Sequence, residues 1–363
     1  MNQENQLILD ICKFQAPDKE KIALGLEQLG NSPAVLGKLL LHRMGGIAYG
    51  VLRECGLLSA VNREFRTTLY SIYTASCLKN QSFYQSLTLL ADCLQDVTVP
   101  YAALKGAYLA DKYPLGYRTS NDIDLLLAPE HVTEISGKLM QAGFKQGYVR
   151  NGIFREASRS EIIYSRMNKG ETVPYILKTN YPFMEFVEID LNFSLDYKPS
   201  DGETVKRMLN TYRKTTSELH TLNKEDFFIH LCAHLYKEAT TYAWIEMGRD
   251  LSLYKFADIY LLLCEFEAQD YVVLEQRIHE LGMEQECVYA MLGTEQLFSI
   301  RDAGFLSCIK RLSQNGTTIL DKVIDPARGK EYVYTVDFCT RFFDENRKNH
   351  LKEVGPLGAT AYV

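Results

Sequence analysis

The chain has 363 residues, of which 46% are hydrophobic and 24% are charged. This is the composition of an ordinary soluble globular protein, and the length allows two domains or one domain with large additions. A net charge of −6 and a pI near 5.8 argue against a protein that coats nucleic acid, although they allow a local basic groove.

The sequence shows no secretory signal and no membrane span. Residues 1–14 are polar and acidic, without the apolar centre of a signal peptide. The longest strongly apolar run, residues 259–264, is too short to cross a bilayer. Nine cysteines are scattered without Cys-x-x-Cys pairs, which fits reduced thiols better than a disulfide framework or a zinc site. We therefore expect a cytoplasmic protein with no membrane partner.

Residues 1–96 are predicted to form a helical region. Apolar residues recur at helical spacing in segments 18–29, 34–54, 62–77 and 83–94, of which the last continues or follows the third. This region carries no recognisable chemical motif. His42 and Arg43 are expected to face the solvent rather than to line a cleft.

A turn at Lys105-Gly106 joins two predicted elements. Residues 97–104 are apolar and predict a strand, and residues 107–113 predict a short helix. A glycine between a strand and a helix lets backbone N–H groups approach a phosphate closely, at the positive end of the helix dipole. Lys105 can reach the same phosphate. Taken alone, Lys105-Gly106 is more simply an ordinary polar turn.

Two carboxylates lie two residues apart on the next predicted strand, residues 122–127. Successive side chains of a strand point to opposite faces, so Asp122 and Asp124 share one face while the residue between them points to a core. Neighbouring carboxylates repel each other unless a cation binds, so this strand predicts a Mg²⁺ site. Arg118, in the preceding loop, is expected to clamp a triphosphate or to balance the carboxylates.

A helix is predicted at residues 129–142, and a region rich in strands follows it. In the last of these strands Glu188, Asp190 and Asn192 face one way and apolar residues face the other. Placed beside the Asp122 strand, it supplies a third carboxylate. The predicted strands, separated by Asn-Gly and Lys-Gly turns, cover residues 144–148, 153–156, 162–164, 173–178 and 184–195.

Residues from about 200 to the end are predicted to be helical again, with a loose tail at 356–363. One predicted helix, residues 226–239, carries His230, His234 and Lys237 on adjoining turns. Two histidines four residues apart are typical of zinc helices, but the glutamate that such a motif requires is missing from His-Leu-Cys-Ala-His. Packing between helices is the favoured interpretation, and a role in a substrate pocket is the alternative.

Three sequence segments together resemble a known superfamily. They are Leu104-Lys105-Gly106, then Tyr117-Arg118-Thr119-Ser120-Asn121-Asp122-Ile123-Asp124-Leu125-Leu126, and then Glu188-Ile189-Asp190-Leu191. They are similar to the DNA-polymerase-β-like nucleotidyltransferases, and most of all to the bacterial branch of uncharacterised nucleotidyltransferases. The resemblance extends over about residues 85 to 265 and includes the helix of His230 and His234.

Two positions depart from the pattern of that superfamily. Ala107 stands where a second glycine or a serine is usual, so a hydroxyl contact to phosphate is lost. Asn192 stands where the branch commonly has histidine, which puts an acid–base role at that position in doubt. The three acids of the pattern are intact.

The resemblance implies an α+β fold with a polymerase-β-like core, in which helices flank a mixed sheet. We expect an N-terminal helical region (1–96), a catalytic core (97–199) and a C-terminal helical domain (200–363). The implied reaction moves a nucleoside monophosphate from an NTP to a hydroxyl-bearing acceptor with release of pyrophosphate.

The resemblance also implies a role for each candidate residue. Asp122, Asp124 and Asp190 are the expected catalytic carboxylates and would hold two Mg²⁺ ions. Further residues are expected to bind the NTP through its phosphates or to line the pocket for the base or the acceptor: Lys105, Gly106, Ala107, Arg118, His230, His234 and Lys237.

Other functions remain open at the level of sequence. A metal-dependent glycosyltransferase also uses Asp-x-Asp to hold a nucleotide diphosphate, and a phosphatase of the Asp-x-Asp type is disfavoured because its first aspartate should close a hydrophobic run. A non-catalytic nucleotide-binding or antitoxin-like module on the same fold is a further alternative. The acceptor is expected to be a small molecule, a peptide or a protein, and nucleic acid is a less favoured partner.

Overall fold

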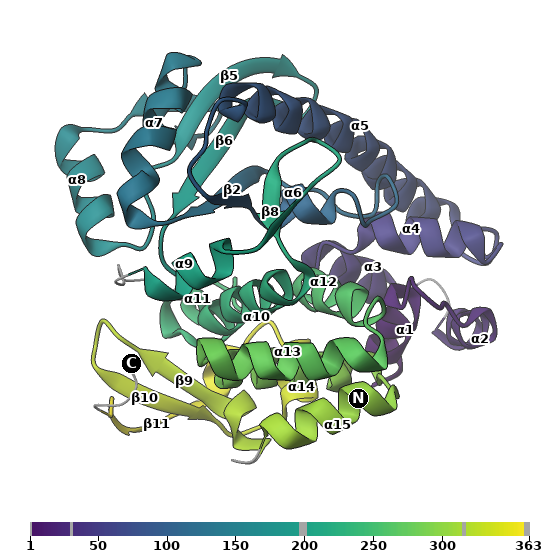
Figure 1. Ribbon diagram of the computed structural model, residues 1–363. Coiled ribbons are helices and arrows are strands. Elements are labelled where there is room, and N and C mark those ends of the chain that lie inside the picture. Colours follow the sequence, from purple (N-terminus) through teal and green to yellow (C-terminus); the bar gives the residue numbers. More distant parts are fainter. Residues whose placement is uncertain (1, 30–31, 196–201, 314–316, 359–363) are drawn as a thin grey trace. The chain divides into compact units, whose positions relative to one another are not determined.

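The computed structural model describes residues 2–29, 32–195, 202–313 and 317–358. The chain divides into two compact units (Figure 1). Unit 1 combines residues 1–71 with residues 228–363, and unit 2 is the continuous segment 72–227. The boundaries expected from the sequence, after residues 96 and 199, remain predictions.

Unit 1 is mainly helical. Helices α5 (Arg63–Leu94) and α10 (Lys224–Thr240) each include a boundary between the units. The other helices of unit 1 are α1 (Gln3–Cys12), α2 (Lys19–Leu29), α3 (Pro33–Leu41), α4 (Gly45–Glu54), α11 (Tyr242–Glu246), α12 (Leu253–Leu263), α13 (Ala268–Leu281), α14 (Glu284–Phe298), α15 (Ala303–Leu312) and α16 (Phe338–Phe342), with 3₁₀ turns η2 (Thr317–Asp321) and η3 (Arg347–His350). In the described part of the chain, none of the helices combines the length and the apolar character that crossing a membrane requires.

Two expectations for unit 1 are wrong. The segment 34–54 forms two helices rather than one, because the chain reverses at Arg43 with a positive φ of 58°. This turn buries His42, which was expected to face the solvent, while Arg43 is exposed. The His42 ring stacks on Phe342 with centroids 5.3 Å apart, and its Nδ1 accepts a hydrogen bond from the Leu253 N–H at 3.3 Å.

The expectation that residues after 200 are purely helical is also wrong. Strands β7 (Tyr212–Lys214) and β8 (His220–Leu222) form a hairpin that belongs to unit 2. In unit 1, β9 (Lys322–Asp325), β10 (Lys330–Tyr334) and β11 (Leu351–Pro356) form an antiparallel sheet. These strands are short and mostly not buried, so they lack the apolar alternation by which a strand is recognised. The predicted loose tail lies largely outside the described residues.

Unit 2 is built on a six-stranded mixed sheet in the order β1-β2-β6-β5-β3-β4. Figure 1 labels its central strands β2, β6 and β5. Strands β2 and β6 are parallel, and the other neighbours are antiparallel. This sheet with its flanking helices confirms the predicted α+β class. The strands are β1 (Tyr101–Ala103), β2 (Asp122–Leu127), β3 (Lys145–Arg150), β4 (Ile153–Glu156), β5 (Tyr175–Tyr181) and β6 (Met184–Asn192); the helices are α6 (Gly106–Leu109), α7 (Val132–Gln141, after the 3₁₀ turn η1, Pro129–His131), α8 (Arg159–Asn168) and α9 (Glu203–Leu209).

One predicted strand of this unit, residues 162–164, is wrong because it lies within α8. Ser158 and Glu161 form a capping box, in which each side chain bonds to the backbone of the other residue and starts the helix. The apolar side chains that suggested a strand are not buried in a sheet, since Ile163 and Tyr164 are 47% and 62% exposed.

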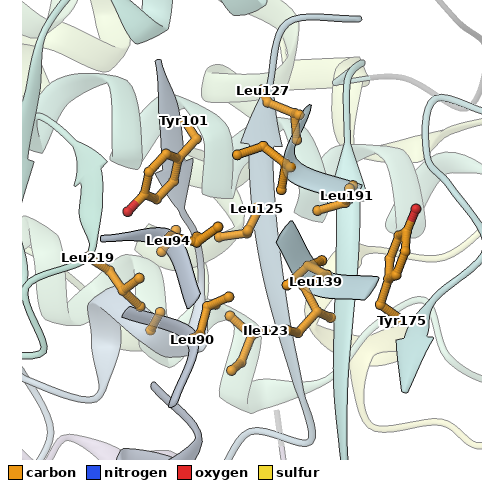
Figure 2. Close-up of a cluster of buried hydrophobic side chains, with 14 of the residues drawn as sticks. Leu90, Leu94, Tyr101, Ile123, Leu125, Leu127, Leu139, Tyr175, Leu191 and Leu219 are labelled. Atoms are coloured by element: carbon orange, nitrogen blue, oxygen red, sulfur yellow. The ribbon is translucent and has the colours of Figure 1, made fainter. Parts of the chain in front are cut away.

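The core of unit 2 lies on one face of the sheet. Leu90 and Leu94 of α5 and Leu139 of α7 pack with Ile123 and Leu125 of β2 (Figure 2). The odd-numbered residues of β2 therefore point into this core, as predicted from alternation. The opposite face of β2 carries Asp122 and Asp124.

Candidate active site

Four carboxylates share one face of two neighbouring strands. In the parallel ladder of β2 and β6, Asp122 pairs with Glu188 and Asp124 pairs with Asp190. Paired residues of adjacent strands project to the same face of a sheet, as do residues two apart along a strand. The predicted juxtaposition of Asp190 with the Asp-x-Asp strand is therefore present in the backbone register.

Three of these carboxyl groups have a raised pKa. Desolvation raises the pKa of Asp122, Glu188 and Asp190, and the charges of neighbouring carboxylates raise it further. The pKa of Asp190 is raised well above its ordinary value, with Asp124 and Asp122 as the strongest charged neighbours. A site with this excess of negative charge favours a bound cation.

Two basic side chains partly offset this charge. The Lys105 ammonium lies 3.0 Å from Asp124 Oδ1, and Asn192 Nδ2 donates to the same oxygen at 3.2 Å. Lys105 and Arg118 both lower the pKa of Asp122, against the larger effects that raise it. The predicted grouping of these two cations with the acids is thus supported by electrostatics, whereas their role in phosphate binding stays a prediction.

The Lys105-Gly106 turn differs in detail from a simple phosphate-binding turn. Lys105 has φ 39° and ψ −108°, a conformation that a residue with a side chain adopts only at a cost. A Cβ on Gly106 would lie 2.0 Å from Ser120 Oγ, so the glycine makes room for the next loop. The Ala107 N–H donates to the Leu104 carbonyl at 3.0 Å. Helix α6 has only four residues, which limits its dipole.

The loop that carries Arg118 is held by helix α5. Asn80 Nδ2 donates to the Arg118 carbonyl at 2.6 Å, and the Gly116 N–H donates to Asn80 Oδ1 at 2.8 Å. Arg118 Nη1 donates to Ser120 Oγ at 2.8 Å. A pocket of about 50 Å³ lies among these residues. It is too small for a nucleotide, because ligand pockets commonly reach several hundred Å³.

A scan against protein families matches the chain over residues 38–299 to a family described as "Uncharacterised nucleotidyltransferase". The match spans more than two thirds of the chain. The chain belongs to this family. A search of curated proteins finds no match.

Membership in the nucleotidyltransferase family confirms the resemblance recognised in the sequence. The matched residues include the Lys105-Gly106 turn, all four carboxylates of the shared face and the α10 residues His230, His234 and Lys237. The family assignment therefore applies to both units of the chain.

His230, His234 and Lys237 belong to unit 1, whereas the carboxylates belong to unit 2. His230 is buried, and His234 Nδ1 lies 3.5 Å from Glu238 Oε2. Lys255 Nζ lies 2.6 Å from the same Glu238 oxygen. These contacts agree with histidines packed between helices, and their role in a base or acceptor pocket stays a prediction.

The structure adds residues that sequence reasoning did not place in the site. Glu188 is directly opposite Asp122, a position that only the register of the ladder reveals. Asn192, which stands where the branch commonly has histidine, donates a hydrogen bond to Asp124. Asn80 and Ser120 support the Arg118 loop, and no periodic signal in the sequence could have identified them.

The chemistry of the four acidic side chains suits a divalent cation. Mg²⁺ prefers carboxylate oxygens, and the shared face offers four carboxylates. Within the described residues, however, no three His, Cys, Asp or Glu side chains already converge as a metal site. The four donors thus share one face of the sheet, and within the described residues their side chains do not meet at a common point.

Proposed function

We propose that the protein transfers a nucleoside monophosphate from an NTP to a hydroxyl-bearing acceptor and releases pyrophosphate. The observation that carries this proposal is the parallel register that pairs Asp124 with Asp190 on the face that also holds Asp122 and Glu188. Family membership supports nucleotidyl transfer over glycosyl transfer.

In the proposed reaction the acceptor oxygen attacks the α-phosphorus, and the bond from that phosphorus to the bridging oxygen of the β-phosphate breaks. Asp190, which lies beside Asp124 in the ladder, takes the acceptor proton. Lys105 and Arg118 bind the negative oxygens of the triphosphate and orient it. Asp122 and Asp124 are the residues that would hold Mg²⁺, which supplies charge neutralisation when it is bound.

The acceptor is proposed to be a small molecule, a peptide or a protein, consistent with the acidic balance of the chain. Incubation with labelled NTPs and a cell extract, followed by identification of the labelled product, would reveal both the acceptor and the preferred base. Transfer of label that requires Mg²⁺ and stops when EDTA is added is the expected result.

Asp122→Ala and Asp124→Ala test the assignment of the carboxylates. Each change is expected to lower nucleotide transfer about a thousandfold, because a metal-binding carboxylate contributes several kcal/mol to the transition state. Asp92→Asn, an exposed aspartate of α5 in the same unit, is the matched control and should retain activity. Unchanged transfer and unchanged Mg²⁺-dependent NTP binding in both alanine variants would overturn the assignment.

Thermal unfolding in the presence of NTPs, compared with transfer of label, separates catalysis from binding alone. A non-catalytic nucleotide-binding module would be stabilised against heat by an NTP with Mg²⁺ but would transfer no label to any acceptor. Heating the wild-type protein with each NTP in turn, with and without Mg²⁺, provides this comparison.

A further inference from the structure

Asp124 is engaged by two donors at a single oxygen atom. Lys105 Nζ and Asn192 Nδ2 both reach Asp124 Oδ1, at 3.0 Å and 3.2 Å. The side chains of Lys105 and Asp124 are only 23% and 8% exposed. An ion pair shielded from water in this way is stronger than the usual pair at a protein surface.

The ammonium of Lys105 acts on more than its direct partner. It also lowers the pKa of Asp122, and Asp190 and Glu188 share the same face of the sheet. A cation beside Asp124 and Asp122 reduces the repulsion between these two carboxylates. Lys105 thus neutralises part of the negative charge on this face, as a bound divalent cation would.

The backbone of Lys105 is held in a costly conformation, with φ 39° and ψ −108°. Such strain persists where the surrounding structure requires it, and it is often found at sites that change state. Lysine carries its charge on a flexible four-carbon stem. The ammonium can therefore change partners while the strained backbone stays in place.

We propose that Lys105 is a stand-in cation: it pairs with Asp124 while no metal ion is bound, and it moves to the triphosphate when metal and NTP arrive. This inference rests on the proposed function. Lys105 and a metal ion compete for Asp124 Oδ1, so binding of one displaces the other.

Binding of Mn²⁺ alone to the full chain tests this competition. Mn²⁺ prefers the same oxygen ligands as Mg²⁺, and its free concentration can be followed by electron paramagnetic resonance. Lys105→Met removes the competing charge at similar length. We expect it to bind Mn²⁺ about tenfold more tightly than the wild type, the equivalent of about 1.4 kcal/mol.

A second variant and a matched control accompany this measurement. Lys105→Gln keeps a donor toward Asp124 without the charge, and it is expected to tighten Mn²⁺ binding even if the methionine variant folds poorly. Lys206→Met is the control, because Lys206 also lies 3.0 Å from a carboxylate oxygen, that of Glu130, at the exposed surface of unit 2. It should bind Mn²⁺ like the wild type.

The second half of the proposal predicts an opposite effect on ATP. With Mn²⁺ at saturation, Lys105→Met and Lys105→Gln should bind ATP about tenfold more weakly than the wild type, because the ammonium is then missing from the triphosphate. Tighter metal binding combined with weaker ATP binding is a signature that a purely structural lysine would not produce.

The outcomes distinguish this inference from the proposed function. If the wild type binds Mn²⁺ and both Lys105 variants bind it equally or more weakly, the stand-in role is wrong while the proposed function stands. If neither the wild type nor either Lys105 variant binds Mn²⁺, the proposed metal site is wrong and this inference is overturned with it.

Discussion

The side chain of Ser120 occupies the place that a Cβ atom at position 106 would take. A methyl group there would meet Ser120 Oγ at 2.0 Å, Ser120 Cβ at 2.6 Å and Phe83 Cζ at 3.2 Å. Contacts this short force the loop of Ser120 and Arg118 to move. The glycine therefore sets the distance between the Lys105 turn and the loop that brings Arg118 to the acids.

Gly106→Ala is expected to lower the free energy of unfolding by about 1–3 kcal/mol because of this clash. Urea denaturation measures the change. Gly137→Ala is the matched control, since Gly137 lies within helix α7 with no atom within 4 Å of its Cβ position. That variant should be neutral or more stable, because alanine favours helices.

Ser120→Gly provides the corresponding rescue. It removes the two closest atoms, so the double variant Gly106→Ala/Ser120→Gly should recover most of the lost stability. Purely additive effects in this double-mutant cycle would show that the contact between the two residues is not the cause.

Residue-level prediction from the sequence succeeded where regular geometry determines orientation. Asp122 and Asp124 could be assigned to one face of their strand, and Glu188 and Asp190 to one face of theirs, because a strand alternates strictly. The contact of Ser120 with Gly106 could not be foreseen, because a loop has no period that relates its residues to a distant turn. The pairing of Glu188 with Asp122 required the strand register, which depends on the whole sheet.

Helix α5 is the element that connects the core of unit 2 with the Arg118 loop. Its apolar side chains, Leu90 and Leu94 among them, pack on the sheet. The 9% exposed Asn80 holds the loop through the Arg118 carbonyl and the Gly116 N–H. The helix thus fixes the loop of Arg118, a proposed NTP-binding residue, relative to the core of unit 2.

Asn80→Ala is expected to cost about 1–3 kcal/mol of stability, since it leaves the buried Gly116 N–H and the Arg118 carbonyl without this partner. Under the proposed function it should also raise the KM for the NTP, because the Arg118 loop is held less firmly. Thermal unfolding and steady-state kinetics measure the two effects.

Asn168→Ala is the control for this change, because the Asn168 amide bonds only locally, to the Tyr164 carbonyl, at an exposed position. Asn80→Asp keeps an acceptor for Gly116 while removing the donor to Arg118, and an intermediate loss is expected. Equal stability of the two Asn80 variants and the wild type would contradict the role given to α5.

Helices and strands that are long and buried could be predicted from the sequence. The sequence left open whether segment 83–94 continues segment 62–77 or follows it, and in the structure both belong to the single helix α5. Asn80 and Ser82 are weak helix formers, and Asn80 gains its contacts with the Arg118 loop there. Residues 162–164 of helix α8 were predicted as a strand because three apolar residues follow one another there, and in the helix Ile163 and Tyr164 are exposed. The short strands after residue 200 carry too few residues for a period to appear.

At the scale of the whole molecule, the carboxylate face of β2 and β6 makes the free energy of unfolding depend on pH. The pKa of Asp190 is raised in the folded state, so between its ordinary value of 3.8 and the raised value the folded chain holds a proton that the unfolded chain has released. This contribution is present at low pH and is lost as the pH rises through the raised pKa. Asp122 and Glu188 act in the same direction.

The free energy of unfolding, measured in EDTA, should therefore fall more steeply with rising pH in the wild type than in Asp190→Asn, by up to about 1.4 kcal/mol per pH unit for each carboxyl group. Mg²⁺ should reduce the difference, because it compensates the charges. The exposed Glu134→Gln of α7 serves as the control. Parallel pH profiles for the wild type and Asp190→Asn would contradict the assigned shift.

Unit 1 is assembled from the two ends of the chain, as the contact of His42 with Leu253 illustrates. On the ribosome, residues 1–71 are made before unit 2, yet their partners in residues 228–363 are not translated until unit 2 is complete. Because domains generally fold as they are synthesised, the sheet with the carboxylates can form early, while the helices of residues 1–71 still lack their contacts with residues 228–363. Residues 1–71 of the nascent chain thus wait longest for their packing partners, and a ribosome that stalls after residue 227 would leave a folded unit 2 attached to residues 1–71 without the rest of unit 1.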